Sequence, residues 1–266
     1  MQKTFLIDGL PESAARYQEG CAVVAIDVIR ATTMAITAAA SGRACYPVDS
    51  VDAAFRLAQL LAGPLLAGEI DGDRPPGFDM NNSPAELSER SDISRPLVLL
   101  SSSGTRLIVN ARGCDVLYLA CFRNISSTAR HLISENYSRI ALLGAGSRGE
   151  FREEDQICCA RIGAQLVQVG YVPENETTIA VMNRWANAKS SDCLHSRSVD
   201  YLRRTGQLAD LRFILRRIDD IAETFIVQDG EVVMVRPDPC LKRELGPLAA
   251  DGATESTRWH RRMSCF

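Results

Sequence analysis

The chain lacks several features that would indicate particular classes of protein. Its 266 residues include three lysines and three histidines, and a net charge of −3 favours neither nucleic acid nor a membrane surface as a partner. The nine cysteines form no C-x-x-C pair, so we expect free thiols in a reducing compartment rather than a structural zinc site. No apolar run has membrane length, and the N-terminus is too polar for a signal peptide. These absences predict a cytoplasmic protein.

Arginine is abundant, because 27 of the 30 basic residues are arginine. Genomic base composition is one explanation. The other is that some guanidinium groups form a forked anion-binding set, since a guanidinium matches the geometry of phosphate and carboxylate groups. The two explanations are compatible with each other.

Short apolar runs alternate with amphipathic segments over the first 170 residues. Each run is continuous, which is typical of parallel strands buried on both faces. The predicted strands are residues 21–28, 44–48, 65–70, 97–100, 115–122 and 139–143. The predicted helices are residues 32–40, 51–61, 104–111, 126–134 and 153–169. The pattern predicts an α/β fold in which helices cover both faces of a mostly parallel sheet or sheets.

The pattern changes after Gly170. Residues 186–217 have the spacing of polar helices with one apolar face, and FIVQDGEVVMV predicts a β-hairpin that turns at Asp229 and Gly230. We therefore expect one α/β domain over residues 1–236, compatible with two intimate subdomains that have a site between them. Residues 237–266 are rich in proline, arginine and small polar residues, and are predicted to be a poorly ordered tail.

Ligands bind beyond the carboxyl ends of strands in such sheets, and the first predicted strand ends in IDVIRATT. Asp27 lies there among apolar residues, and a buried carboxylate needs a cation. Arg30 follows, and Thr32 and Thr33 open the next helix. One interpretation is a structural Asp–Arg pair with a threonine cap. The other is a metal-binding aspartate, an anion-binding arginine and a helix N-terminus that faces phosphate.

The third predicted strand is followed by GEIDGDRPPGFDMNNSP. Glu69 closes the strand, and Ser83 precedes a proline that suits the first turn of a helix. The loop between them carries acidic and amide side chains, namely Asp71, Asp73, Asp79 and Asn82. A plain surface loop explains Asp71 and Asp73 well, whereas Glu69 and Asp79 have apolar neighbours and are the better candidates for ligands.

The fourth predicted strand is followed by LLSSSGTR and the fifth by ACFRNIS. Hydroxyl groups and free backbone N–H groups at a strand-to-helix turn suit a phosphate or sulfonate oxygen. Arg106 falls in the first helical turn, where a cation is unfavourable unless an anion lies nearby. Capping by Ser103 is the structural alternative, and Asn124 either reaches the same cleft or caps the next helix.

The sixth predicted strand is followed by LLGAGSRGEFREED, in which Gly144, Gly146 and Gly149 spell G-x-G-x-x-G. This is a weak dinucleotide fingerprint, because the charged run after it is not the small apolar helix start that a pyrophosphate needs. The acidic residues 153–155 suit a helix N-terminus on dipole grounds alone. They also suit a carboxylate that faces Asp27 across a cleft.

Four motifs, DVIRATT, GE…GFDMNNSP, SSSGTR and GAGSRGEF-REED, in this order and spacing, resemble the 2-phosphosulfolactate phosphatase family over residues 22–235. The chain departs from the family pattern at residues 101–103, where threonines and an asparagine are common, and at Asn81, where glycine is common. The resemblance implies a phosphoric monoester hydrolase that uses Mg²⁺ to convert 2-phospho-3-sulfolactate to 3-sulfolactate and phosphate, a step toward coenzyme M.

The resemblance and the chemistry of the loops together give a predicted site. The predicted catalytic residues are Asp27, Arg30 and Asp155. The predicted Mg²⁺ ligands are Asp27, Glu69, Asp79 and Glu153. The predicted substrate-binding residues are Thr32, Thr33, Asn82, Ser83, Ser102, Ser103, Gly104, Thr105, Arg106, Asn124, Gly146 and Arg148.

In this hypothesis Mg²⁺ relieves the repulsion between water and the phosphoryl oxygens, while Arg30 and Arg106 hold phosphate and sulfonate by forked hydrogen bonds. Three alternatives stay open. They are a phosphatase for another small anionic phosphoester, a non-catalytic anion-binding protein that would need the arginines but not the carboxylates, and a dinucleotide oxidoreductase. The predicted partner is a small anionic phosphoester rather than nucleic acid or a membrane, and the sequence is compatible with a homo-oligomer.

Overall fold

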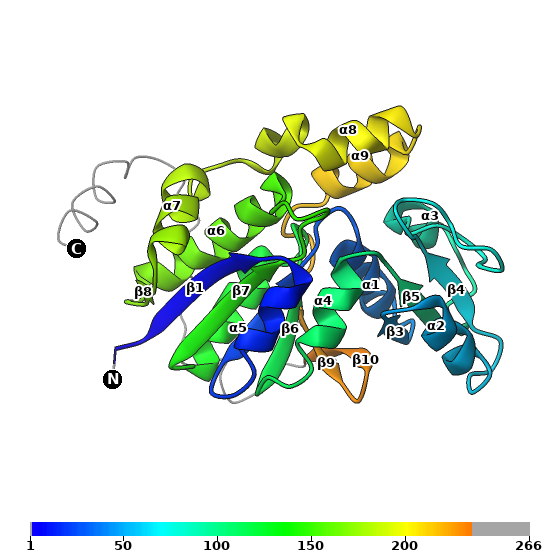
Figure 1. Ribbon diagram of the computed structural model, residues 1–266, viewed down its shortest axis with the longest axis horizontal. Helices are drawn as coiled ribbons and strands as arrows, with labels where there is room; N and C mark the ends of the chain where they lie inside the picture. Colours follow the sequence, from blue (N-terminus) through cyan, green and yellow to red (C-terminus); the bar gives the residue numbers. More distant parts are fainter. Residues whose placement is uncertain (1, 236–266) are drawn as a thin grey trace. The chain divides into compact units, whose positions relative to one another are not determined.

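The computed structural model describes residues 2–235, which form two β-sheets with helices between and around them (Figure 1). The strands are β1 (Thr4–Gly9), β2 (Ala22–Ile26), β3 (Cys45–Val48), β4 (Leu65–Gly68), β5 (Leu97–Leu100), β6 (Val116–Ala120), β7 (Arg139–Gly144), β8 (Val172–Pro173), β9 (Thr224–Gln228) and β10 (Glu231–Val235). The α-helices are α1 (Ala31–Ala40), α2 (Val51–Ala58), α3 (Pro84–Ser88), α4 (Gly104–Asn110), α5 (Ile125–Glu135), α6 (Glu153–Gln168), α7 (Glu176–Trp185), α8 (Arg197–Arg204) and α9 (Leu208–Arg216). The 3-10 helices are η1 (Pro11–Arg16) and η2 (Ser190–His195). The predicted tail lies outside the described residues.

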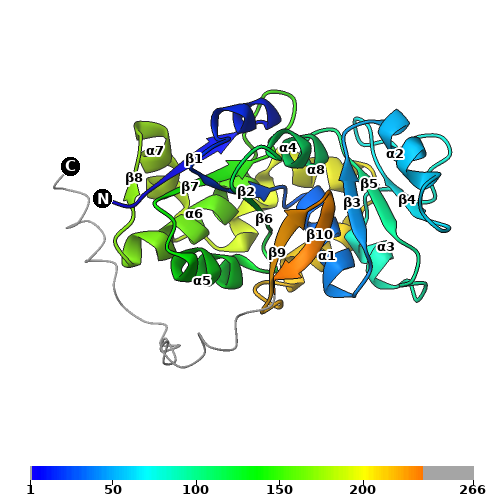
Figure 2. The same ribbon diagram turned by 90° about the horizontal axis from the view of Figure 1, so that it is seen from below.

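The larger sheet has seven strands in the order β10-β9-β6-β2-β7-β1-β8. Strands β6, β2, β7, β1 and β8 are parallel, and the predicted hairpin β9–β10 joins the β6 edge in antiparallel orientation. Helices α5, α6 and α7 cover one face, and α4 and η1 cover the other (Figure 2). The predicted fold class is therefore confirmed. Strand β1, which the apolar pattern did not predict, lies between β7 and β8.

The smaller sheet has three parallel strands in the order β3-β5-β4. The sequence left open whether the strands form one sheet or more, and in the structure the polar strand ends are divided between two sheets. Helix α1 lies between the sheets, where it contacts β6 on one side and β3 and β5 on the other. Its first eight residues, 31–38, are all buried. Many of its side chains are alanine, and their small size allows both sheets to approach the helix closely.

The small sheet is buried on both faces, which explains its continuous apolar strands. Leu97 and Leu99 of β5 belong to the core shared with α1 and the large sheet. Val98 and Leu100 alternate with them and belong to a second core with Ala54 of α2. Successive side chains of a strand point to opposite faces, so a strand between two cores needs apolar residues at every position.

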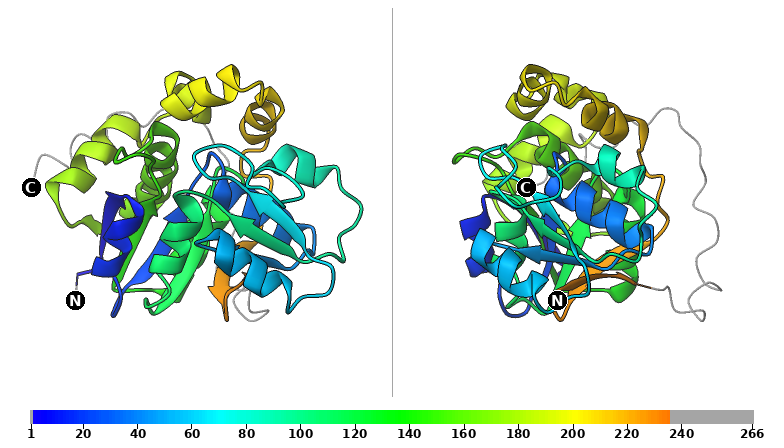
Figure 3. Two further views of the ribbon diagram at one scale, coloured as in Figure 1. Left: turned by 45° about the vertical axis from the view of Figure 1, so that its right-hand side comes forward. Right: turned by 90° about the vertical axis from the view of Figure 1, so that its right-hand side faces the viewer.

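The predicted helical region 186–217 contains η2, α8 and α9. Helix η2 packs against α6, which covers the large sheet, and α9 packs against α3, beside the small sheet. Helices α8 and α9 therefore bridge the two sheets above the carboxyl ends of their strands (Figure 3). Among the described residues, no helix combines the length and apolar character needed to cross a bilayer.

Candidate active site

A cavity of 780 Å³ lies where the strand ends of the two sheets meet, and α8 contributes residues to its wall. This volume is in the range of small-molecule sites in proteins. The loops after β2, β4, β5 and β7 reach it, as the rule for parallel sheets predicts. The predicted site residues that line it are Asp27, Arg30, Glu69, Asn82, Ser102, Ser103, Gly146, Arg148 and Asp155.

Asp27 follows the last residue of β2, and its carboxylate lies against the start of α4. A methyl group added at Gly104 would lie 2.1 Å from Asp27 Oδ2 and 2.6 Å from Ala31 Cβ, so this position has room only for glycine. Burial raises the pKa of Asp27 to about 7, and the negative charge of Glu69 acts in the same direction. Gly104, predicted to bind substrate, instead makes space for the predicted catalytic carboxylate.

Asp155 lies in the first turn of α6 and is held by two backbone amides. Val28 N–H donates to its Oδ1 at 2.9 Å, and Gly146 N–H donates to its Oδ2 at 3.3 Å. Burial raises the pKa of Asp155 well above its usual value, and the charges of Asp27 and Glu154 raise it further. The carboxyl group is therefore fixed in place but poorly stabilised as an anion.

Glu154, which was not among the predicted site residues, is buried beside this pair. Burial raises the pKa of its carboxyl group, and its Oε2 has no hydrogen-bond partner among residues 2–235. The three acidic residues 153–155 therefore differ in their surroundings. Glu153 forms an ion pair with Arg184 at 3.2 Å. Glu153, a predicted metal ligand, does not line the cavity, whereas Glu154 and Asp155 join Asp27 in a buried acidic cluster.

Glu69 organises the loops that follow β4 and β5. Its Oε1 accepts from Ser102 N–H at 2.8 Å, and its Oε2 accepts from Ser102 Oγ at 3.0 Å and from Gly72 N–H at 2.6 Å. The serine loop was predicted to offer its donors to a phosphate or sulfonate. In the structure two donors of Ser102 are used by Glu69, and Ser103 lines the cavity beside them.

Arg30, at the N-terminus of α1, forms a buried ion pair that the sequence did not reveal. Its Nη1 lies 2.6 Å from Asp210 Oδ2, and both side chains are almost fully buried. Gln207 also accepts from Nη1, and Asn81 Oδ1 lies 3.5 Å from Nη2. The expected Asp27–Arg30 proximity exists, but the hydrogen-bonded partner of the guanidinium comes from α9.

Further arginines surround the cavity. Arg152 is mostly buried, and its Nε has no hydrogen-bond partner within the described part of the chain. Helix α8 adds three more arginines, which sequence reasoning missed, namely Arg197, Arg203 and Arg204. A charged face is usual for a surface helix, so no local signal marks these residues. Together with Arg30 and Arg148 they make the upper wall strongly basic.

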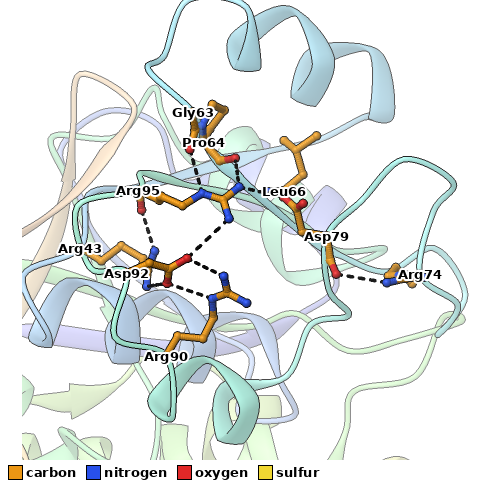
Figure 4. Close-up of polar contacts among 9 residues, drawn as sticks. All are labelled: Arg43, Gly63, Pro64, Leu66, Arg74, Asp79, Arg90, Asp92 and Arg95. Atoms are coloured by element: carbon orange, nitrogen blue, oxygen red, sulfur yellow. Dashed lines mark hydrogen bonds and ion pairs between the residues drawn. The ribbon is translucent and has the colours of Figure 1, made fainter.

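Asp79, a predicted metal ligand, lies outside the cavity in a cluster of ion pairs beside the small sheet (Figure 4). Its Oδ2 accepts from Leu66 N–H at 2.8 Å and contacts Arg95 at 3.4 Å. Arg106 also lies outside the cavity, where it pairs with Glu12 of η1 at 3.2 Å. The anion expected near Arg106 is thus a glutamate of the same chain.

The remaining predicted substrate-binding residues have structural roles. Thr32 Oγ1 accepts from Asp27 N–H, and Thr33 Oγ1 donates to Val28 O. Thr105 bonds to the backbone of Ser101, Asn124 Oδ1 accepts from Cys121 N–H, and Ser83 caps α3. None of these five predicted residues, Thr32, Thr33, Ser83, Thr105 and Asn124, lines the cavity. They hold the loops that present the cavity residues.

Asn82 is different, because it is buried, lines the cavity, and its Oδ1 has no hydrogen-bond partner in residues 2–235. A buried amide oxygen without a partner is expected to meet a ligand, an ion or a water molecule. Within the same residues, no three His, Cys, Asp or Glu side chains are grouped closely enough to form a complete metal site. Any metal here would need other oxygens in addition to the carboxylates.

The fold and the cavity define an α/β protein with a cleft between two sheets that is lined by both arginine and acidic side chains. The 2-phosphosulpholactate phosphatase family model matches residues 7–229. The chain belongs to this family, as the four motifs predicted.

Proteins named "Probable 2-phosphosulfolactate phosphatase" are similar to this chain. One from Carboxydothermus hydrogenoformans is 36% identical over 138 residues, which are 52% of this chain and 57% of that protein. One from Pseudothermotoga lettingae is 35% identical over 159 residues, which are 59% and 66% of the two chains. One from Caldicellulosiruptor saccharolyticus is 27% identical over 213 residues, which are 75% and 87%. The matched region thus spans less than two thirds of the first two relatives.

Proposed function

We propose that this protein hydrolyses 2-phospho-3-sulfolactate to 3-sulfolactate and phosphate with the help of Mg²⁺. The observation that carries the proposal is the pair of buried carboxyl groups, Asp27 and Asp155, that lie beneath a wall of arginines in one cavity, with the buried Glu154 beside them. A purely anion-binding protein would need the basic wall but not the acidic floor. Family membership and the names of the relatives support the substrate.

The donor set around the cavity suits Mg²⁺. Asp27 and Glu69 offer carboxylate oxygens, and Asn82 offers an amide oxygen that lacks a partner among the described residues. Mg²⁺ is commonly bound by one or two carboxylates, with water and substrate oxygens completing its shell, so a preformed cluster of three carboxylates is not required. When bound, the ion would reduce the negative charge that repels an incoming water molecule.

The other residues have separate tasks in this proposal. Arg30 and Arg152 bind phosphoryl oxygens and stabilise the charge of the transferring group. Asp155, held by Val28 and Gly146 amides, accepts a proton from the attacking water, and its raised pKa makes it a stronger base than an exposed aspartate. The new bond joins the water oxygen to phosphorus, and the bond from phosphorus to the substrate oxygen breaks. The departing alkoxide takes up a proton from solvent, and Asp155 returns the proton that it accepted to solvent.

Phosphate release from 2-phospho-3-sulfolactate, measured with Mg²⁺ and then with excess EDTA, tests the proposal. We expect turnover with Mg²⁺ and none with EDTA. A panel of phosphorylated organic acids separates this substrate from other small anionic phosphoesters. Equal turnover with and without Mg²⁺ would exclude the role of the metal. Binding without turnover across the whole panel would favour a non-catalytic anion-binding protein.

A further inference from the structure

Asp210 of α9 connects three segments that are distant in sequence. Its Oδ2 lies 2.6 Å from Arg30 Nη1, while its Oδ1 accepts from Ser83 Oγ at 2.7 Å and from Ala85 N–H at 3.0 Å. The residue is 2% exposed. One buried carboxylate thus links the start of α1, the first turn of α3 and the bridging helix α9.

One nitrogen of the Arg30 guanidinium group, Nη1, is held by hydrogen bonds, whereas the edge formed by Nε and Nη2 is largely free. Nη1 donates to Asp210 and Gln207, both from the segment that begins just before α9. On the opposite edge, Nη2 has only the 3.5 Å contact with Asn81 Oδ1. The side-chain hydrogen bonds that Arg30 makes within residues 2–235 come from Nη1 and Nη2, and none comes from Nε. Nε and Nη2 form the fork with which a guanidinium binds two oxygens of one anion.

The remainder of the cavity offers Arg30 no equivalent support. Asp27, the nearest acidic neighbour in sequence, is buried against Gly104 and Ala31 rather than bonded to Arg30. Without the carboxylate of α9, the buried guanidinium would have no charged partner to hold Nη1, and it would be free to take other side-chain conformations. A small misplacement of a binding group is enough to weaken catalysis strongly.

We propose that Asp210 is the positioning residue for Arg30, because it fixes Nη1 from α9 and leaves the Nε–Nη2 edge free to bind an oxyanion. The inference rests on the proposed function, in which Arg30 binds the phosphoryl group. The inference also explains a role of the bridging helices. Helix α9, which packs beside the small sheet, holds Arg30, which follows a strand of the large sheet.

The test compares Asp210→Asn, Arg30→Gln and the double variant. Asparagine keeps one oxygen for Ser83 and Ala85 but presents an amide N–H₂ to Arg30, so donor faces donor. We expect each single variant to weaken the binding of inorganic phosphate, measured by titration calorimetry, by about tenfold and to lower kcat/KM by a similar factor. The double variant should be no worse than Arg30→Gln alone, because Asp210 acts through Arg30.

Asp220→Asn is the matched control. Asp220 forms an equally close, forked ion pair with Arg123, at 2.9 and 2.8 Å, and neither residue lines the cavity. This variant should lower the melting temperature while phosphate affinity stays within about twofold of wild type. If Asp210→Asn does not fold, Asp210→Glu takes its place, since it retains the buried negative charge, and the same double-variant comparison applies.

The outcomes are distinguishable. Unchanged phosphate affinity in a folded Asp210 variant overturns the inference, as does a double variant whose loss equals the product of the two single losses. A wild-type protein that neither binds phosphate nor releases it from the phosphoester overturns the proposed function, and the inference with it. The inference is supported if Asp210→Asn lowers the affinity for phosphate in the wild-type background but not in the Arg30→Gln background, and if Asp220→Asn does not lower it.

Discussion

Two groups of acidic side chains, one beside the small sheet and one at the cavity, have opposite electrostatics. Beside the small sheet, Asp92 accepts from Arg43 at 2.9 Å and from Arg90 Nε at 3.0 Å, with Arg95 at 3.5 Å (Figure 4). Hydrogen bonds from Arg90 and Arg43 hold the pKa of Asp92 well below its usual range. The negative charge of Asp92 is therefore neutralised by arginines of the same chain.

In the cavity the opposite holds. Asp27 and Asp155 line it, and Glu154 is buried beside them. Burial raises the pKa of all three carboxyl groups, and the charges of neighbouring carboxylates raise those of Asp27 and Asp155 further. The arginines of the cavity instead pair with other acids, as Arg30 does with Asp210 and Arg152 with Glu150. The comparison shows how to separate a structural ion-pair cluster from a candidate site: the first is neutralised within the chain, and the second has charge left for a ligand.

The largest expected effect comes from Asp27→Asn, which removes one charge from the cavity and keeps the side-chain shape. If the proposed function is right, kcat/KM for the phosphoester should fall by at least about 10²–10³-fold, because an electrostatic partner of the transition state is lost. The metal-free protein should be at least as stable as wild type, since a repelled carboxyl group is gone. Steady-state kinetics and thermal melting measure the two effects.

Asp92→Asn is the control for that experiment. It should leave kcat/KM within about twofold of wild type, because the cluster lies outside the cavity, and it should reduce stability. If instead Asp92→Asn abolished activity while Asp27→Asn left it intact, the assignment of the two clusters would be reversed.

The next largest effect is expected from Gly104→Ala. The added methyl group would overlap Asp27 Oδ2, so the carboxylate must move, and we expect a loss of about 10–100-fold in kcat/KM. Gly163→Ala in α6 is the matched control, because its methyl group would meet Met182 Sδ and Phe5 at 2.8 Å in the core. Both variants should lose about 1–3 kcal/mol of stability from overpacking, but only Gly104→Ala should lose activity. Equal activity losses would point to a general effect of destabilisation.

The sequence predicted the fold class well because the strands between two cores must be apolar at every position, as β5 shows with Leu97–Leu100. It did not predict that the strands divide between two sheets, since pairing depends on contacts such as those of α1 with both sheets. It also missed β1, whose apolar run is only Phe5, Leu6 and Ile7, too short to stand out.

The candidate site was predictable where a polar residue follows a buried strand, as at Asp27 and Glu69, or where an acidic residue opens the helix after a strand, as at Asp155. It was not predictable where the decisive partner is distant in sequence. Asp210 lies on an amphipathic helix, where acidic residues are ordinary, and only the fold brings it to Arg30. Arg106 shows the converse, because the local rule required an anion and the fold supplied Glu12.

The smallest expected effect is on the pH dependence of stability, and it has opposite signs in the two clusters. The folded pKa of Asp27 is raised to about 7, against about 3.9 when unfolded, so its stabilising contribution is complete below the unfolded pKa and is lost as the pH rises toward 7. The folded pKa of Asp92 is lowered, so its contribution is present above the unfolded pKa and is lost as the pH falls through the folded pKa.

Urea denaturation of the metal-free protein across a pH series measures both contributions. Asp27→Asn should flatten the decline in the free energy of unfolding between about pH 4 and 7 by about 1–2 kcal/mol. Asp92→Asn should flatten the loss on the acid side by less, about 0.2–1 kcal/mol, because solvent screens the ion pairs of this partly exposed side chain. Saturating Mg²⁺ should remove the decline in wild type but act more weakly on Asp27→Asn, because the ion then supplies the missing positive charge. If Asp27→Asn instead changed the free energy of unfolding only at acid pH, the carboxylate of Asp27 would already be neutralised within the chain, as that of Asp92 is.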